Sequence, residues 1–347
     1  MSAYLDTRVS LYSGRLWRDA ELDALVSVPD GAMAATLVAH GLPQLVAGYD
    51  RPEGAQHDPR SLEQRIIARI LDETQVLIRP LAGEARAFLA FWTARFEISN
   101  VKTLLRSKMS GERPAAALAR LTPMGPFARL DNQALAHAED VGELLRRLEA
   151  GPYADIVRHA RRAFEQSHDP FSLDAALDRS YYEGLVLRAH PLETELGAPF
   201  RSLMSSLIDR INLVWLLRYR FNYKLPPAQV YYLLVGSRYG LGGARLRELA
   251  ALDSTQAVLA ALPAPWQAQL AGVADIPGAF ARMEDLAAAQ ARRVLRSNAP
   301  GVARSFAYLI LRERDLRAVR AVLRGRHLGL AEADIRTALR RAANEDF

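Results

Sequence analysis

The sequence predicts an all-α protein on three observations. Alanine, leucine and arginine, which favour helices, dominate the composition. Few segments show the alternation of β-branched and polar residues that is typical of strands. An apolar pattern with helical spacing also recurs three times along the chain. With 347 residues, half of them hydrophobic and 24% charged, the chain is long enough to fold into two or three packed domains.

The threefold repeat has the same columns in each copy. A phenylalanine stands 12 positions before an asparagine column, an acidic residue stands three positions before it, and an apolar run closed by basic residues follows. The third copy has alanine in the asparagine column. The repeat predicts three similar helical units at about 1–130, 131–236 and 237–347. The column residues are Phe88, Glu97 and Asn100, then Phe200, Asp209 and Asn212, then Phe306, Asp315 and Ala318.

The elements expected in order are all helices, and the three longest carry the repeat. Short helices are expected after Asp19 and Asp30, which are placed to cap them. Residues 48–60 and 118–130 are expected to be irregular, because proline and glycine interrupt them. Pro80, Pro191 and Pro300 precede the three long helices. The expected helices are 4–17, 62–79, 83–109, 133–148, 153–167, 172–190, 194–221, 228–235, 255–262, 266–270, 276–297, 302–324 and 331–343.

The repeat has a simple physical interpretation. The apolar columns share one side of a helix and are expected in the core. The acidic and basic columns are too far apart to pair within one helix. Each must therefore find its partner on a neighbouring helix, in a helix cap or on another protein, and for Glu97, Asp209 and Asp315 an ion pair between helices is expected. The basic columns suit the helix C-terminal dipole or a partner protein. The candidate partner-binding residues are Lys102, Arg106, Lys108, Arg218, Arg220, Lys224 and Arg324.

Composition and motifs exclude several kinds of site. Without cysteine the chain has no disulfide, thiolate nucleophile or Cys-based zinc site. The first 17 residues do not form a signal peptide, and no apolar run reaches the ~18–20 residues of a spanning helix. Phosphate-loop, dinucleotide-binding and HExxH patterns are missing as well. We therefore expect no catalytic residue, no cofactor and no metal. The net charge of +6 suits an anionic partner, although arginine-rich composition alone also produces it.

Three segments together resemble a known family. They are EISNVKTLLRSKMSG (97–111), DRINLVWLLRYRFN with the following LPPAQVYYLLVGSRYGL (209–241), and ERDLRAVRAVLRGRHLGLAEADIRTAL (313–339). The opening helix with Tyr4, Arg8 and Tyr12 fits too. The chain resembles the component of rotary V-type and A-type ATPases that is called C in prokaryotes and d in eukaryotes. No single motif is specific, and Ala318 departs from the pattern, but the threefold arrangement extends over nearly the whole chain.

The resemblance implies a fold and a role. The expected fold is three helical bundles around a pseudo-threefold axis, which together form a funnel. The expected role is that of a non-catalytic rotor subunit for proton or sodium transport, peripheral to the cytoplasmic face of a membrane. Its expected partners are the central-stalk subunits D and F and the proteolipid ring, with membrane contact only through the ring and no nucleic acid bound.

Three other classes of protein stay open. A helical nucleic-acid-binding protein would use the basic charge, although acids are interleaved with the bases and no recognition motif is present. A helical enzyme of the isoprenoid-binding kind would need an aspartate-rich metal cluster, which the sequence lacks. A generic α-solenoid would show stacked repeats of roughly 33–47 residues instead of units of more than 100.

Overall fold

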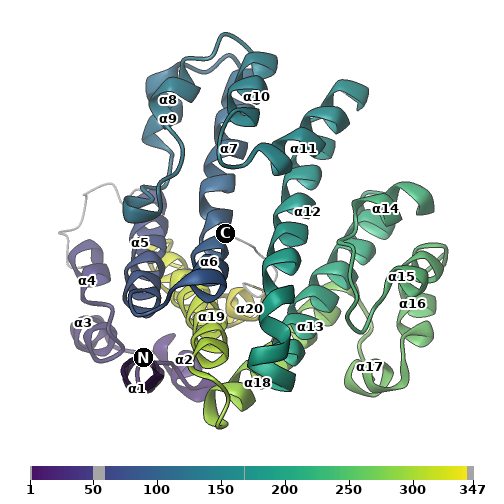
Figure 1. Cartoon of the computed structure of the whole chain (residues 1–347). Coiled ribbons are helices and arrows are strands. Elements are labelled where there is room, and N and C mark those ends of the chain that lie inside the picture. The colour runs from purple at the N-terminus through teal and green to yellow at the C-terminus, as the bar shows by residue number, and fades with distance from the viewer. Residues whose placement is uncertain (1, 50–58, 168, 342–347) are drawn as a thin grey trace.

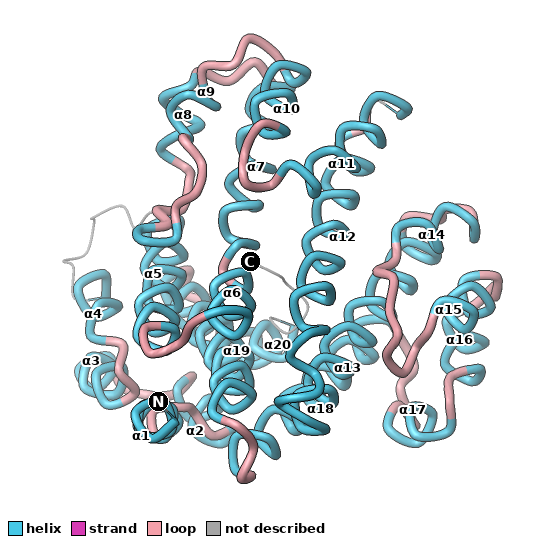
Figure 2. The backbone as a smooth tube through the Cα atoms, in the orientation of Figure 1, coloured by secondary structure: helices cyan, strands magenta, loops and turns pink. Residues whose placement is uncertain are grey.

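The computed structural model describes residues 2–49, 59–167 and 169–341. Within these ranges every regular element is a helix, and Figure 2 shows the helices joined by loops without a strand. The predicted all-α class is confirmed. Most of the loop expected at 48–60 lies outside the described residues.

The first half of the chain holds the N-terminal helices and the first copy of the repeat. Figure 1 shows α1 to α4 at the lower left, with α7 rising beside α12. The elements are α1 (Ser2–Ser13), α2 (Asp19–Leu25), α3 (Asp30–Ala39), α4 (Pro43–Tyr49), α5 (Pro59–Ile78), α6 (Gly83–Trp92), α7 (Ala94–Met109), α8 (Pro114–Ala119), the 3₁₀ turn η1 (Gly125–Phe127), α9 (Asn132–Ala136), α10 (Val141–Glu149) and α11 (Ala154–Ser167).

The second half holds the other two copies. Short helices α14 to α17 lie at the right of Figure 1. The elements are α12 (Pro170–Ala189), the 3₁₀ turn η2 (His190–Leu192), α13 (Glu193–Leu217), the π-helix η3 (Arg218–Asn222), α14 (Pro227–Leu233), α15 (Gly243–Ala250), α16 (Thr255–Ala261), α17 (Ala264–Gln269), α18 (Ile276–Arg296), α19 (Gly301–His327) and α20 (Glu332–Arg341).

The three phenylalanines of the repeat meet in the core. Phe88, Phe200 and Phe306 are all 0% exposed. The ring of Phe88 meets those of Phe200 and Phe306 edge to face, with centroids 5.2 Å and 4.9 Å apart. The Phe200 and Phe306 centroids are 6.1 Å apart. Aromatic pairs in this geometry are favourable beyond their buried area. We call this cluster the phenylalanine hub, because it joins α6, α13 and α19 at one point.

The N-terminal segment packs on the third copy of the repeat, although the two are at opposite ends of the chain. Helix α1 lies against α19, and the rings of Tyr12 and Tyr308 are 5.5 Å apart. Farther along α19, the Arg326 guanidinium donates to the carbonyls of Val26 and Val28, at 3.2 Å and 2.5 Å. Helix α19 therefore contributes to two apolar clusters, one around the hub and one beneath α2 to α5.

Several predicted elements differ from the structure for local reasons. The helix predicted over 83–109 is divided at Thr93, whose hydroxyl donates to the Ala90 carbonyl at 2.7 Å. The helix predicted over 194–221 is kinked at Gly197, where φ is 71°, and it ends as a π-helix.

Short elements and caps also differ from the prediction. Helices α8 and α15 were not predicted, because each is only about two turns or less between glycine- and proline-rich stretches. Asp19 and Asp30 lie in the first turns of α2 and α3, whereas the cap positions are Arg18 and Pro29. An acid in the first turn still complements the helix dipole.

Candidate partner-binding hollow

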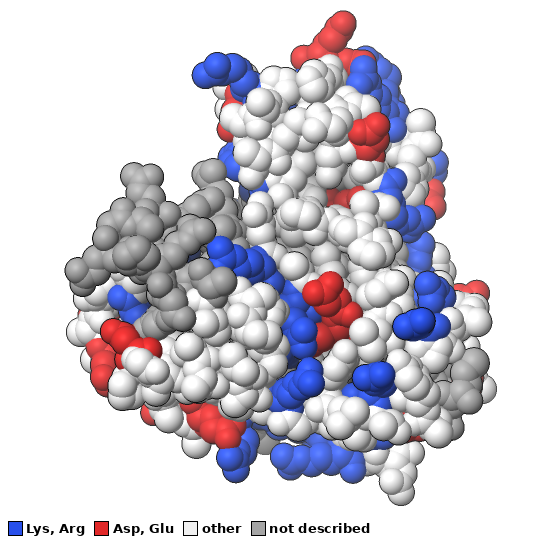
Figure 3. Space-filling view, turned by 90° about the vertical axis from the view of Figure 1, so that its left-hand side faces the viewer, with Lys and Arg blue, Asp and Glu red and all other residues white. Residues whose placement is uncertain are grey.

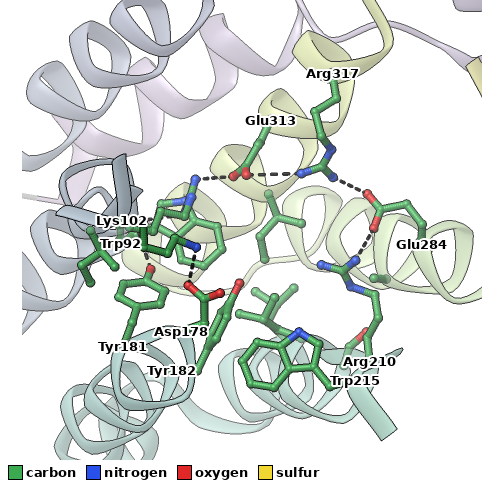
Figure 4. Close-up of a pocket in the computed structure, with 17 residues that line it drawn as sticks. Trp92, Lys102, Asp178, Tyr181, Tyr182, Arg210, Trp215, Glu284, Glu313 and Arg317 are labelled. Carbon is green, nitrogen blue, oxygen red and sulfur yellow. Dashed lines mark hydrogen bonds and ion pairs between the residues drawn. The ribbon is translucent and has the colours of Figure 1, made fainter. Parts of the chain in front are cut away.

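An open hollow with a cavity volume of about 70 Å³ lies beside the hub, where its lining residue Trp92 contacts Phe306. All three copies of the repeat line it, through α6 and α7, α12 and α13, and α18 and α19. Its wall is mixed. The apolar and aromatic side chains are those of Trp92, Ile98, Leu203, Leu207, Tyr182, Trp215 and Ile310, and almost as many lining residues are charged. A concave surface that combines apolar side chains with convergent charges can bind a partner. We call this feature the central hollow (Figure 4).

A continuous chain of charges runs across the wall of the central hollow. Glu284 of α18 pairs with Arg210 of α13 at 2.8 Å and with Arg317 of α19 at 2.7 Å. Arg317 also reaches Glu313 at 3.2 Å, and Glu313 pairs with Arg95 of α7. Figure 4 shows this chain passing from one unit to the next. Three arginines and two glutamates leave the chain with one excess positive charge.

The electrostatics of Glu284 follow from this arrangement. Burial alone would raise the pKa of its carboxyl, but Arg210 and Arg317 outweigh burial and hold the pKa below the usual value. Glu284 is 5% exposed and stays ionised at neutral pH. Because all five side chains are mostly buried, the chain of charges is a fixed part of the wall.

The sequence did not single out these five residues, but the repeat contained a signal. Arg95, Leu207 and Glu313 each stand five positions before the asparagine column, and all three line the central hollow. In this column the first copy has a base, the second an apolar residue and the third an acid. The Arg95–Glu313 ion pair therefore joins the same column of two copies.

The acidic column anchors loops, so the expectation of ion pairs between helices is wrong for the described residues. Glu97 accepts the backbone N–H groups of Arg129 and Leu130, at 2.8 Å and 3.0 Å, and the Tyr153 hydroxyl at 2.6 Å. Asp209 accepts the Leu241 N–H at 2.9 Å. Buried backbone N–H groups need such acceptors.

Asp209 also imposes a glycine on the loop that it anchors. A Cβ atom at Gly240 would lie 2.7 Å from the Asp209 Oδ2 atom, closer than a side chain tolerates. Backbone and carboxylate can approach this closely only without a side chain at position 240.

The asparagine column clamps a second loop. Asn100 donates to the Thr122 carbonyl and accepts its N–H, both at 2.8 Å. Asn212 makes the same two bonds to Val235, at 3.0 Å and 2.8 Å. The third copy holds Ala318 in this column, and the alanine side chain can make neither bond. The clamp is therefore a feature of the first two copies.

In the third copy Asp315 accepts from the N-terminal segment, at the backbone N–H of Trp17, 2.9 Å away. Burial raises the pKa of Asp315 to about 7, against the lowering effect of that hydrogen bond and of nearby arginines. A raised carboxyl pKa means that the folded state favours the neutral acid. The loss of folding free energy caused by ionising this buried carboxyl is therefore absent below about pH 4. It grows as pH rises toward 7 and is complete above about pH 7.

We expect Asp315→Asn to flatten the pH dependence of stability. In the wild type this carboxyl removes up to about 4 kcal/mol of the free energy of unfolding between pH 4 and 8, at 1.36 kcal/mol per pKa unit. Urea unfolding at pH 4 and pH 8 measures the difference. Asp253→Asn, at a side chain that is 96% exposed, is the control. An unchanged pH dependence in Asp315→Asn would refute the role of this carboxyl.

The structure places the seven predicted partner-binding residues in different surroundings. Four of them, Lys102, Arg106, Arg218 and Arg220, contact other side chains or carbonyls of the chain. Lys102 pairs with Asp178 at 2.7 Å at the edge of the central hollow, and Arg106 pairs with Asp174. Arg218 lies over the Phe280 ring at 5.7 Å, and Arg220 bonds the Ala250 carbonyl at 3.1 Å and Asp253 at 3.2 Å. Lys108 is partly exposed, and Lys224 and Arg324 are exposed.

Neither a metal site nor a membrane-spanning helix is found among the described residues. No group of three or more acidic or histidine side chains is placed to hold a metal ion. No helix in these ranges is both long and apolar enough to cross a bilayer. On the face shown in Figure 3, basic and acidic side chains are interspersed.

The sequence of this chain is similar to that of a known protein family. A sequence model of the ATP synthase (C/AC39) subunit matches residues 5–338. The C subunit of the A-type ATP synthase of Methanocaldococcus jannaschii is 23% identical, over 97% of this chain and 86% of the relative. That of Haloquadratum walsbyi is 25% identical over 96% of each. The C subunit of the V-type ATP synthase of Deinococcus radiodurans is 23% identical over 52% of this chain and 51% of the relative.

The class is therefore that of a non-catalytic subunit of rotary ATPases. The chain belongs to the ATP synthase (C/AC39) subunit family. This membership confirms the resemblance noted in the sequence and the expectation of a subunit without its own catalytic activity.

Proposed function

We propose that this protein is the rotor socket of a V/A-type rotary ATPase, in which the central hollow receives the foot of the central stalk, formed by subunits D and F. The other end of the molecule would rest on the proteolipid ring at the cytoplasmic face of the membrane. The three copies of the repeat would form the three bundles of the funnel. One observation carries the proposal: all three copies line one hollow, and the phenylalanine hub joins them beside it.

The charges of the molecule suit this role. The chain of charges in the wall has one excess positive charge. The three motif helices are those that carry the apolar run of the repeat, namely α7, α13 with its π-helix η3, and α19. Lys108, Lys224 and Arg324 lie at or just beyond their C-terminal ends, away from the hub. Cations at these ends would attract an acidic stalk foot and speed its association. A socket that binds partly through exposed charges also releases its partner when salt screens them.

Affinity purification tests the proposed partners. The tagged protein is isolated from gently solubilised membranes of its own cell, and the recovered proteins are identified. We expect the proteolipid and subunits D and F, with release of the protein by salt. Recovery of nucleic acid, or of no partner from a purely soluble fraction, would overturn the socket role and favour the nucleic-acid-binding or scaffold alternatives.

Charge removal tests the proposed mode of binding. Lys108, Lys224 and Arg324 are replaced together by alanine, and the affinity for the purified D–F pair is measured at about 0.01 M and about 0.15 M salt, between which the Debye length falls from about 30 Å to about 8 Å. We expect roughly tenfold weaker binding at low salt and a smaller salt dependence.

A matched variant controls for the loss of three charges. Arg79, Arg201 and Arg296 are also exposed. Arg79 and Arg296 lie near Pro80 and Pro300, and Arg201 donates to the Glu193 carbonyl at the start of α13, so the three lie toward the opposite ends of the motif helices. Their replacement by alanine is expected to leave binding unchanged. Equal losses in the two triple variants would mean that binding depends on net charge and not on this end of the helices.

A further inference from the structure

Of the three helices that carry the repeat, the second ends differently from the other two. Helices α7 and α19 each end at a glycine in the left-handed conformation, Gly111 with φ 68° and Gly329 with φ 65°. In both, the following N–H group bonds the carbonyl five residues back, from Glu112 to Ser107 and from Leu330 to Gly325, at 3.0 Å. This is the common glycine cap of a helix C-terminus. Each glycine stands 11 positions after the asparagine column.

The second copy contains one extra residue before its cap. Lys224 occupies the left-handed position with φ 56°, and it stands 12 positions after Asn212. The π-helix Arg218–Asn222 accommodates the insertion, because the Tyr223 N–H bonds the Arg218 carbonyl at 3.0 Å. We call residues 218–224 the π-turn.

The backbone of Lys224 is strained where glycine would not be. Lys224 is the only non-glycine residue with positive φ in the described ranges. A side chain in this conformation costs folding free energy that the two glycine caps avoid. Strain of this kind is concentrated at sites of function. The lysine side chain is therefore expected to have a function other than stabilising the fold.

The π-turn places an aromatic ring and a cation on the surface, next to the central hollow. Tyr223 is 53% exposed, and its ring packs on Phe171 at 4.7 Å. Phe171 contacts Tyr219 at 5.4 Å, and Tyr219 contacts Trp215, a wall residue of the central hollow, at 6.0 Å. A file of aromatic rings thus runs from the hollow to the surface. Lys224 is exposed at its outer end.

We propose that the π-turn is a contact site for an acidic protein segment, namely the part of the stalk foot that leaves the central hollow. This inference rests on the proposed socket function. An apolar side chain of the partner would lie on the Tyr223 ring, and its carboxylates would face Lys224. The asymmetry has a use in a socket built from three similar units, since a site present in one copy fixes the orientation of the stalk.

Two single variants separate the role in binding from the role in folding. Tyr223→Ala removes the exposed ring. Lys224→Gly removes the cation and the strain together, so it is expected to raise the thermal unfolding midpoint. Tyr223→Ala is expected to weaken binding of the purified D–F pair to the full chain by roughly tenfold, as for an anchor residue of an interface, and Lys224→Gly by roughly threefold, as one of three cations that together contribute about tenfold. Leu328→Ala is the matched control, because Leu328 is 61% exposed and precedes Gly329 as Tyr223 precedes Lys224.

Each result decides between named outcomes. Weaker binding by both variants, with Leu328→Ala unchanged and Lys224→Gly more stable, supports the site. Wild-type binding by both variants overturns it and leaves the socket function intact. A lower midpoint for Lys224→Gly would mean that the lysine serves the fold, which also overturns it. If the wild-type chain does not bind the D–F pair, the socket function itself fails and this inference with it.

Discussion

We expect Phe88→Ala to lower the free energy of unfolding by about 3–5 kcal/mol, the range for truncation of a buried phenylalanine. The cost is at the upper end because Phe88 contacts both other members of the phenylalanine hub, at 5.2 Å and 4.9 Å. Urea unfolding measured by circular dichroism gives the difference. A change below about 1 kcal/mol would mean that the three units do not depend on this contact.

A double-mutant cycle distinguishes the hub from ordinary core packing. Phe88→Ala and Phe306→Ala together are expected to show a coupling of about 0.5–1.5 kcal/mol, since their rings touch edge to face. Phe280 is also buried, but it lies near the start of α18, far along that helix from the end that is connected to the start of α19, where Phe306 lies. Phe88→Ala with Phe280→Ala is expected to be additive. Additivity in the first cycle would contradict the hub.

Glu284→Ala has the second large expected effect, a loss of about 3–5 kcal/mol, because it leaves two mostly buried arginines without their shared carboxylate. Glu248→Ala, which breaks an exposed pair with Arg245, is expected to change stability by about 1 kcal/mol or less. A similar small effect at Glu284 would show that the chain of charges contributes little.

The pH dependence provides a second test of Glu284. Its pKa is lowered in the folded protein, so its stabilising contribution is present above the pKa of the unfolded chain and is lost as pH falls through the lowered value. The wild type is therefore expected to lose stability in acid more steeply than Glu284→Gln does. Parallel acid unfolding curves for the two proteins would contradict this account.

Much of this fold could be predicted because helix patterning is local. The apolar columns, the three prolines and the acid–asparagine columns identified the long helices and their equivalence. The roles of Glu97 and Asp209 could not be predicted, because their partners are backbone N–H groups of loops 32 and 33 residues later, which no periodicity reveals.

The central hollow was missed for a related reason. Its charged wall depends on which faces of α7, α13 and α18–α19 converge, and that is a property of packing between distant segments. The attachment of the N-terminus to Asp315 is equally non-local, since Trp17 and Asp315 are separated by almost the whole chain. The sequence boundaries at 130 and 236 stay predictions, and the Trp17 contact indicates that the third unit also includes N-terminal residues.

Site-specific cross-linking tests the central claim most directly, since the natural chain has no cysteine to compete with an introduced one. Ser206→Cys places a thiol in the wall of the central hollow, and Thr337→Cys places one on exposed α20, outside it. Each variant is labelled with a photoactivated cross-linker and mixed with the D–F pair. The socket function predicts cross-links to the stalk from position 206 and none from position 337. Cross-links of equal yield from both positions, or from position 337 alone, would contradict it.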